Sequence, residues 1–406
     1  MVLKQYQIIS NEVLPMILVG IDVAKDKHDC FIMNSDGEIL AKAFTFSNTL
    51  EGFNFLYEKI CSVSSHQDKI KVGLEATGHY SYNILGFLLD KGLPTFVINP
   101  LHTNLYRKSL SLRKTKTDKV DSRTIAMMLL SDVDLKPYSE TSYHNEQLKS
   151  LSRYRFTKVK ERAKLKTSVS RLVQILFPEL GQLVSTLHMA SVYRLLEEYP
   201  GSSYIASAHL SRLTNIIFES SKGKYNRDTA ITFREVARKS IGSVIPAKSL
   251  ELKHTIKLIR ELSSEIDEID AEIKIMMEEI ASPITTIPGI GYNMGAMIIS
   301  EIGDFSRFSS PDKILAYAGV SPSTYQSGKI DNCYSHMEKR GSRYLRYALF
   351  IAAQKVCHWD NTFSEYLSKK RSEGKHYYVA ISHAVKKLVR VIFHLERTRQ
   401  PYLKAA

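Results

Sequence analysis

The sequence is poor in cysteine and has no long apolar run, and each absence excludes a class of protein. None of its cysteines belongs to a Cys-x-x-Cys pair (Cys30, Cys61, Cys333 and Cys357). The chain therefore predicts neither a zinc site nor a disulfide framework. No apolar stretch reaches the roughly 20 residues that span a bilayer, and residues 1–11 lack the pattern of a signal peptide. We expect a cytoplasmic protein that does not enter a membrane.

Acidic residues are also in deficit. The 406 residues include 56 Lys and Arg against 42 Asp and Glu, a formal net charge of +14. Such a basic chain favours nucleic acid or another anionic partner. Charge alone leaves open an ordinary enzyme with a basic surface. The length is sufficient for two or three domains.

The first hundred residues alternate strand and helix patterns. Apolar or alternating runs predict five strands, and amphipathic runs between them predict helices over 50–62 and 81–91. The strands are expected at 17–23, 28–33, 38–46, 69–75 and 93–99. Three strands in series followed by alternating helices and strands are typical of an RNase-H-like α/β domain.

Four acidic residues in this part predict a metal site. Asp22 and Glu75 each end an apolar strand, where a carboxylate is costly unless it is paired or holds a metal. Asp118 and Asp121 are three residues apart on a helix expected to begin near Lys116, so they share one face. The four together suit Mg²⁺ or Mn²⁺. Taken alone, this pair is better explained by Asp118 as a helix N-cap and Asp121 as a solvated acid of the first turn.

Two long helices are predicted in the middle of the chain. Residues 145–180 form a basic helix, and residues 250–280 carry a heptad repeat of Ile and Leu. The repeat predicts a coiled coil. Its partner is either the 145–180 helix folding back or the same helix of another subunit.

The last third has features of a nucleic-acid contact surface. The glycines of Pro288-Gly289-Ile290-Gly291 lie between two helical patterns, as in a helix–hairpin–helix module, and would let backbone N–H groups approach a phosphate. The alternative is a tight turn between helices. A basic cluster with interleaved aromatics follows at 339–346 and indicates a phosphate-binding face.

Six motifs, in order and spacing over residues 16–395, resemble the IS one-ten family of insertion-sequence transposases. They occupy residues 20–25, 74–78, 116–121, 287–291, 326–329 and 339–341. The resemblance implies a RuvC-like catalytic domain (16–145), a helical coiled-coil connector for dimerisation (146–282) and a C-terminal transposase domain (283–395).

The resemblance also implies the roles of particular residues. The family's DEDD tetrad maps to Asp22, Glu75, Asp118 and Asp121, and its nucleophilic serine maps to Ser327, with Ser342 as the rival. The residues expected to contact nucleic acid are Lys116, Arg123, Gly289, Gly291, Lys329, Lys339, Arg340, Arg343 and Arg346. The implied partners are DNA, a structured noncoding guide RNA and further copies of the chain in a homodimer or homotetramer.

The expected function is therefore that of a DNA transposase with a magnesium-binding carboxylate site and a covalent phosphoseryl intermediate. Two alternatives remain open. One is a metal-dependent nuclease of Holliday-junction-resolvase type, in which water attacks the phosphate. The other is a DNA-binding protein without catalysis.

Overall fold

The structure is a computed structural model. It describes residues 15–64, 66–76, 78–98, 100–110, 118–131, 137–138, 140–322, 326–327, 330–331 and 336–403. The chain forms two compact units, Met1–Tyr143 and His144–Ala406. Within the described ranges, no helix is both long and apolar enough to cross a membrane.

The first unit is built on a five-stranded sheet with strand order β3-β2-β1-β4-β5. Its strands are β1 (Ile17–Val23), β2 (Lys27–Asn34), β3 (Ile39–Ser47), β4 (Ile70–Glu75) and β5 (Thr95–Ile98). The first three pair antiparallel, whereas β4 pairs parallel to both β1 and β5. All five strands lie where the sequence predicts them, to within a few residues at each end.

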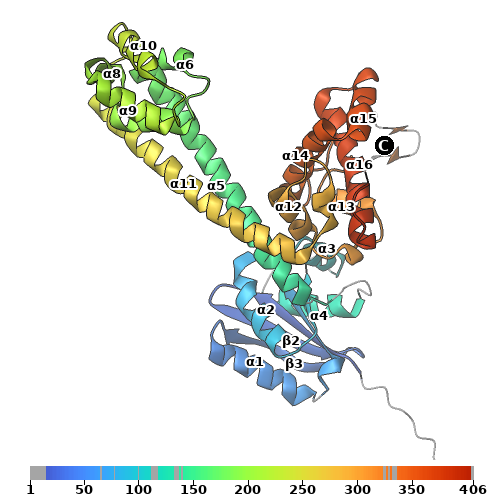
Figure 1. The fold of residues 1–406 in the computed structure, drawn as a ribbon. Helices are drawn as coiled ribbons and strands as arrows, with labels where there is room; N and C mark the ends of the chain where they lie inside the picture. Colours follow the sequence, from blue (N-terminus) through green and yellow to red (C-terminus); the bar gives the residue numbers. More distant parts are fainter. Residues whose placement is uncertain are drawn as a thin grey trace, which may run out of the picture. The chain divides into compact units, whose positions relative to one another are not determined.

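Helices cover both faces of this sheet, because successive side chains of a strand point to opposite faces. Ile17, Val19 and Ile21 of β1 pack in one apolar cluster with α1 (Leu50–Val63) and α2 (Ser81–Asp90). Leu18 packs on the other face, in a cluster with α4 (Asp118–Ser131). The unit also contains α3 (Pro100–Leu110) and the short helices η1 (Gln67–Lys69) and η2 (Gly78–Tyr80). Figure 1 shows α1 and α2 in front of the sheet.

Two long helices organise the second unit, and Figure 1 shows them side by side. They are α5 (Glu140–Leu176) and α11 (Pro246–Ile280). Arg155 of α5 pairs with Asp270 of α11, and Arg171, further along α5, pairs with Glu251, which comes earlier in α11. The two helices therefore run antiparallel. The heptad seam of α11 is buried against the same chain at its first four positions, Leu252, Ile259, Ile266 and Ile273.

One end of this helix pair carries five shorter helices. They are α6 (Leu180–Leu183), α7 (Ala190–Glu198), α8 (Ser202–Ser207), α9 (Leu210–Ser220) and α10 (Arg227–Arg238). They share one apolar cluster with Leu172 and Leu176 of α5 and Leu252 and Ile256 of α11. The sequence predicted only several short helices here.

The other end of the pair packs into a second helical core, which includes Leu148 of α5 and Ile273 of α11. Its helices are η3 (Pro283–Thr286), α12 (Tyr292–Ile302), η4 (Phe305–Arg307), α13 (Pro311–Tyr317), α14 (Arg343–Trp359), α15 (Asn361–Ser372) and α16 (Tyr377–Thr398). A two-stranded hairpin, β6 (Gln326–Ser327) with β7 (Ile330–Asp331), lies between α13 and α14 in sequence. The expected combination of a mixed α/β N-terminal part and a mainly helical C-terminal part is confirmed.

Candidate functional site

Asp22 and Glu75 lie at the same edge of the sheet. They follow the last paired residues of the parallel strands β1 and β4, Ile21 and Leu74. Both residues are half-buried. Alternate residues of a strand point to the same face of the sheet. Asp22 therefore shares a face with Leu18 and Gly20, and Glu75 shares a face with Gly73, so both carboxylates are on the face that α4 covers.

Two glycines bring α4 directly onto this face. A Cβ added at Gly20 would lie 2.1 Å from the Ser122 carbonyl oxygen and 2.5 Å from the Ala126 nitrogen. A Cβ added at Gly73 would lie 2.9 Å from Ile125 Cγ2. Only a strand without side chains at these points lets the helix backbone come so close. The glycines thereby fix where the first turn of α4, with its two acidic residues, meets the sheet.

Asp121 lies in that first turn and is held by an arginine that the sequence analysis did not single out. Arg107 Nη1 of α3 donates to Asp121 Oδ1 at 2.8 Å, and the Asp121 side chain is only 7% exposed. Arg107 Nη2 donates to Asn104 Oδ1 at 2.9 Å. Asp118 begins α4, but its side chain is not among those that the structure describes.

A further acidic residue, Asp29, faces the same edge and was also missed. It stands directly opposite Asp22 across the antiparallel pair of β1 and β2, is 6% exposed, and accepts a hydrogen bond of 2.6 Å from Thr45 Oγ1. The signal was present in the sequence, because a hairpin closing at residues 24–26 sets this register. Because Asp29 lies inside the strand rather than at its end, the pattern that points to Asp22 and Glu75 does not point to it.

The donor set suits a hard divalent cation, since Asp22, Glu75 and Asp121 offer only carboxylate oxygens. Among the described side chains, however, no three His, Cys, Asp or Glu are close enough to hold a metal ion. Oxygen chemistry and location therefore fit the metal, whereas the described carboxylates are not assembled around one position.

In the second unit, the backbone places Ser327 on β6, where it pairs with Ile330 of β7. The hairpin is flanked by an antiparallel bridge between Pro322 and Met337. Ser327 therefore lies on a short β-hairpin in a part of the chain that is otherwise helical. Lys329 and Lys116, also predicted to contact nucleic acid, lie outside the residues that the structure describes.

Ser342, the rival serine, is occupied by structural contacts. Its hydroxyl accepts from the Leu345 N–H at 3.1 Å, which caps α14, and donates to Glu301 Oε2 at 2.6 Å. Glu301 is 2% exposed and also receives two hydrogen bonds from Arg153. A hydroxyl engaged as both donor and acceptor, and bonded to the buried Glu301, is positioned to hold α14 and α12 together.

The predicted phosphate-binding residues at 339–346 divide into two kinds. Lys339, Arg340 and Arg343 are exposed. Arg346, in contrast, donates to the carbonyl oxygens of Ala318 at 3.0 Å and Lys339 at 3.2 Å. It therefore shapes the turn that presents the other three.

Two close approaches pin this turn to the end of α13. Gly341 has φ +106°, and a Cβ there would lie 2.0 Å from the Tyr317 carbonyl oxygen. Gly319 has φ +66°, and its Cβ would lie 2.2 Å from the Arg340 carbonyl oxygen. The glycine of the Lys-Arg-Gly motif thus has a backbone role, which leaves the two basic side chains in solvent.

The glycines of the predicted hairpin also differ from each other. Gly289 has φ +89°, and a Cβ there would lie 3.0–3.1 Å from Lys355 backbone atoms and from Trp359 Cδ1 of α14. Gly291 is the exposed N-cap of α12, with open space around it. Gly289 therefore serves packing on α14, and Gly291 is the one that a phosphate could approach.

On α4, Arg123 is exposed and its guanidinium lies 5.9 Å from the Phe31 ring.

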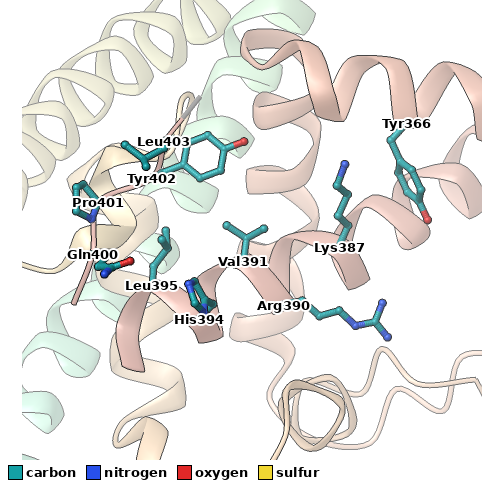
Figure 2. A pocket seen from close by; sticks show the side chains of 10 residues that line it. All are labelled: Tyr366, Lys387, Arg390, Val391, His394, Leu395, Gln400, Pro401, Tyr402 and Leu403. Atoms are coloured by element: carbon teal, nitrogen blue, oxygen red, sulfur yellow. The ribbon is translucent and has the colours of Figure 1, made fainter. Parts of the chain in front are cut away.

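A cavity of about 590 Å³ lies elsewhere in the second unit, between α15, α16 and the segment 400–403. Figure 2 shows its lining side chains, and none of the predicted site residues is among them. Two of its cations are engaged: Lys387 Nζ lies 4.9 Å from the Phe363 ring centre, and Arg390 pairs with Asp312 at 3.4 Å. The cavity thus lacks the acidic chemistry found at the sheet edge.

Two family models match the chain. A transposase model of DEDD type from the IS110 group matches residues 19–178, and the model described as "Transposase IS116/IS110/IS902 family" matches residues 281–368. An uncharacterized protein of insertion element IS116 from Streptomyces clavuligerus is 23% identical over 96% of each chain. The pilin gene-inverting protein of Moraxella bovis is 24% identical over 95% of this chain and 97% of its own. A transposase of insertion sequence element IS1111A from Coxiella burnetii is 22% identical over 83% of this chain and 77% of its own.

Proposed function

The chain belongs to the IS110 family of transposases, and we propose that it cuts and rejoins DNA with two cooperating groups, a carboxylate site and a serine nucleophile. The observation that carries this proposal is the approach of α4 to β1 and β4 through Gly20 and Gly73. It brings the elements that bear Asp22, Glu75, Asp118 and Asp121 to one edge of the sheet. The strand order and the antiparallel β2 support an RNase-H-like, RuvC-like fold for this unit.

The carboxylate site would use a divalent metal ion, Mg²⁺ or Mn²⁺. A metal-binding role for the DEDD group follows from the family, and the all-oxygen donor set of this chain fits it. When bound, such an ion supplies positive charge that stabilises the scissile phosphate during displacement. Asp22 and Glu75, fixed at the ends of neighbouring strands, would orient it, and the first turn of α4 would supply the remaining carboxylates.

Ser327 would be the nucleophile. Its oxygen would form a bond to the scissile phosphorus while the bond from phosphorus to the departing DNA oxygen breaks, and its proton would leave with a nearby base or water. A DNA hydroxyl would then reverse the step and release the serine. The contacts of Ser342 with Leu345 and Glu301 support Ser327 over its rival, because they commit the Ser342 hydroxyl to structure.

The division of labour would follow three parts: residues 16–145 carry the carboxylates, 146–282 form the helical connector, and 283–395 carry the serine. One apolar cluster lies wholly within the connector, whereas a second joins the ends of α5 and α11 to the C-terminal helices. The carboxylates and Ser327 could meet within one chain or between copies in a homodimer or homotetramer. Exposed Lys339, Arg340, Arg343 and Arg123, and the N–H groups after Gly291, would contact DNA or a guide RNA by its backbone.

A plasmid recombination assay tests this function. The chain is expressed with the noncoding DNA that flanks its element, a donor and a target, and recombinant junctions are counted by sequencing. Asp22→Asn and Ser327→Ala should each abolish junctions, while Ser342→Ala should keep them at temperatures where that variant is folded. Continued cleavage by Ser327→Ala with loss in Asp22→Asn would indicate a water-using nuclease. Full activity of Asp22→Asn would exclude the carboxylate mechanism.

A further inference from the structure

The ion pair between Arg107 and Asp121 has an unusual location. Asp121 belongs to the carboxylate set at the sheet edge, and its side chain is nearly buried, with 7% exposed. Its ion-pair partner is the Arg107 guanidinium from the neighbouring helix α3 at 2.8 Å, a side chain that is itself 24% exposed. A buried carboxylate needs a counter-charge, and here an arginine provides one to a carboxylate that the proposed function assigns to a metal ion.

The arrangement of the other described acids is consistent with this occupation. No three of them are placed to hold a metal ion, although Asp22 and Glu75 lie at the same edge. One oxygen of Asp121, Oδ1, points at Arg107. A carboxylate that already faces a guanidinium has to exchange that partner, or share it, before it can serve as a metal ligand.

We propose that Arg107 is a placeholder cation that neutralises Asp121 in the metal-free protein and moves to a nucleic-acid phosphate when the metal site forms. The inference rests on the function proposed above and deepens it, because it makes assembly of the carboxylate site depend on substrate. Arg107 is then a positioning residue in the free protein.

The chemistry of arginine supports the exchange. A guanidinium is a planar fork of donors whose geometry matches phosphate as well as carboxylate. Arg107 lies in the last turn of α3 beside the exposed Lys108, so an approaching phosphate meets two positive charges. Asn104, one turn earlier, accepts from Nη2 at 2.9 Å with an uncharged amide oxygen, which attracts a guanidinium less strongly than a carboxylate or a phosphate does. Departure of the Arg107 guanidinium from Asp121 would be favourable only when a metal ion replaces the positive charge that Asp121 loses.

Binding of Mn²⁺ to the full-length chain tests the proposal without any activity measurement. The free ion gives an electron paramagnetic resonance signal that is lost on binding, so the dissociation constant can be titrated. Arg107→Gln removes the competing cation and should bind Mn²⁺ about tenfold more tightly than wild type, since close charge pairs couple by at least that factor. Lys108→Gln removes the same charge one residue away and, in the absence of DNA, should bind Mn²⁺ like wild type.

Nucleic acid supplies the second arm. Short duplex DNA should tighten Mn²⁺ binding by the wild type and have little effect on Arg107→Gln, in which the exchange has already been made. An equal effect of DNA on both proteins would contradict the exchange. So would Arg107→Gln binding Mn²⁺ no better than wild type, which would leave Arg107 with a purely structural role.

Two further variants keep the outcome readable. Asn104→Ala keeps every charge and releases Nη2, so it should also tighten Mn²⁺ binding. If Arg107→Gln does not fold, an unchanged dissociation constant in Asn104→Ala overturns the proposal. Asp22→Asn should weaken Mn²⁺ binding. If it binds like wild type, the carboxylate site of the proposed function fails as well, whereas loss in Asp22→Asn alone, without any change in the Arg107 and Asn104 variants, rejects only the placeholder.

Discussion

At the scale of single residues, Gly20 does more for the candidate site than its lack of a side chain suggests. It sits two residues before Asp22, and the backbone of α4 fills the space where a Cβ would be. Because backbone atoms cannot turn aside like the end of a side chain, any larger residue must push α4 off the sheet. The close approach therefore links strand geometry to the placement of Asp121.

Gly20→Ala should therefore destabilise the first unit by about 2–3 kcal/mol and reduce recombination even at temperatures where the chain remains folded. Gly86→Ala is the matched control, because its added Cβ meets nothing within 4 Å in the middle of α2. That control should be neutral or stabilise by up to about 1 kcal/mol. Calorimetric unfolding of both variants measures the difference, and equal effects would mean that α4 adjusts freely.

Replacing each of the two serines by alanine should have opposite effects on stability and recombination. Ser342→Ala removes an N-cap and a donor to buried Glu301, so it should cost about 1–2 kcal/mol of stability. Ser327→Ala should leave thermal unfolding unchanged while abolishing junctions. Measuring unfolding and recombination on the same preparations separates the roles. A stable Ser342→Ala that makes no junctions would return Ser342 to candidacy.

At the scale of secondary-structure elements, charge explains how α5 finds its partner. The sequence predicted a positive surface on this helix and left the partner of the heptad open. Several of its cations instead face acids of α11: Arg155 pairs with Asp270, Lys158 with Glu265 and Arg171 with Glu251. Basic α5 and acidic α11 are complementary along their length, and the apolar seam lies between them.

Charge reversal tests this pairing. Arg155→Glu should lower stability because it places like charges together, and adding Asp270→Arg should restore most of the loss. The coupling between half-exposed partners should be about 1 kcal/mol. Lys257 and Glu261, an exposed pair within α11 at 3.9 Å, serve as control and should show almost no coupling. A double variant no better than the single one would show that the ion pair does not specify the partner.

A histidine makes the same region sensitive to pH. His188 lies within reach of Tyr193 Oη at 2.9 Å and Ser170 Oγ at 3.4 Å. Burial lowers the pKa of His188, and the nearby Lys166 lowers this pKa further. The unfolded chain takes up a proton near its usual pKa of about 6.5, whereas the folded chain resists it. Stability is therefore fully present above that pH and is lost as the pH falls below it.

Thermal unfolding across pH 5 to 8 checks this sign. Wild type should lose stability toward pH 5, and His188→Gln should lose less over the same interval. Because the other histidines are common to both proteins, the difference between the two curves isolates His188. Parallel curves would mean that its environment does not oppose protonation.

The hydrophobic pattern within each segment was sufficient to predict the five strands and the two long helices, since local periodicity encodes such elements. The ends of β1 and β4, and with them Asp22 and Glu75, follow from such patterns. Asp29 and Arg107 do not, because their importance depends on which strand faces Asp22 and which helix reaches Asp121. The partner of α11 likewise required knowledge of charges on a helix about a hundred residues earlier in the sequence.

At the scale of the whole molecule, the candidate carboxylates and the candidate serine belong to different compact units. The chain carries a formal net charge of +14, and DNA carries dense negative charge. Binding should therefore depend steeply on salt, through the release of counterions from the phosphates.

The salt dependence can be assigned to particular residues. Replacing Lys339, Arg340 and Arg343 by Gln should weaken DNA binding for all sequences and reduce the slope of log K against log salt by about three. Asp22→Asn should bind DNA with an unchanged slope, because it lies in the acidic site. Fluorescence anisotropy over a range of salt concentrations measures both. An unchanged slope in the triple variant would remove this turn from the DNA-binding surface.

The antiparallel pair of α5 and α11 sets a fixed distance between its two ends. Both helices span that distance, and the ion pairs between them hold their residues in register. An insertion in one helix alone would shift every ion pair beyond it out of register. The length of the helix pair can therefore change over evolution only when both helices gain or lose the same number of turns, which predicts paired length changes among relatives.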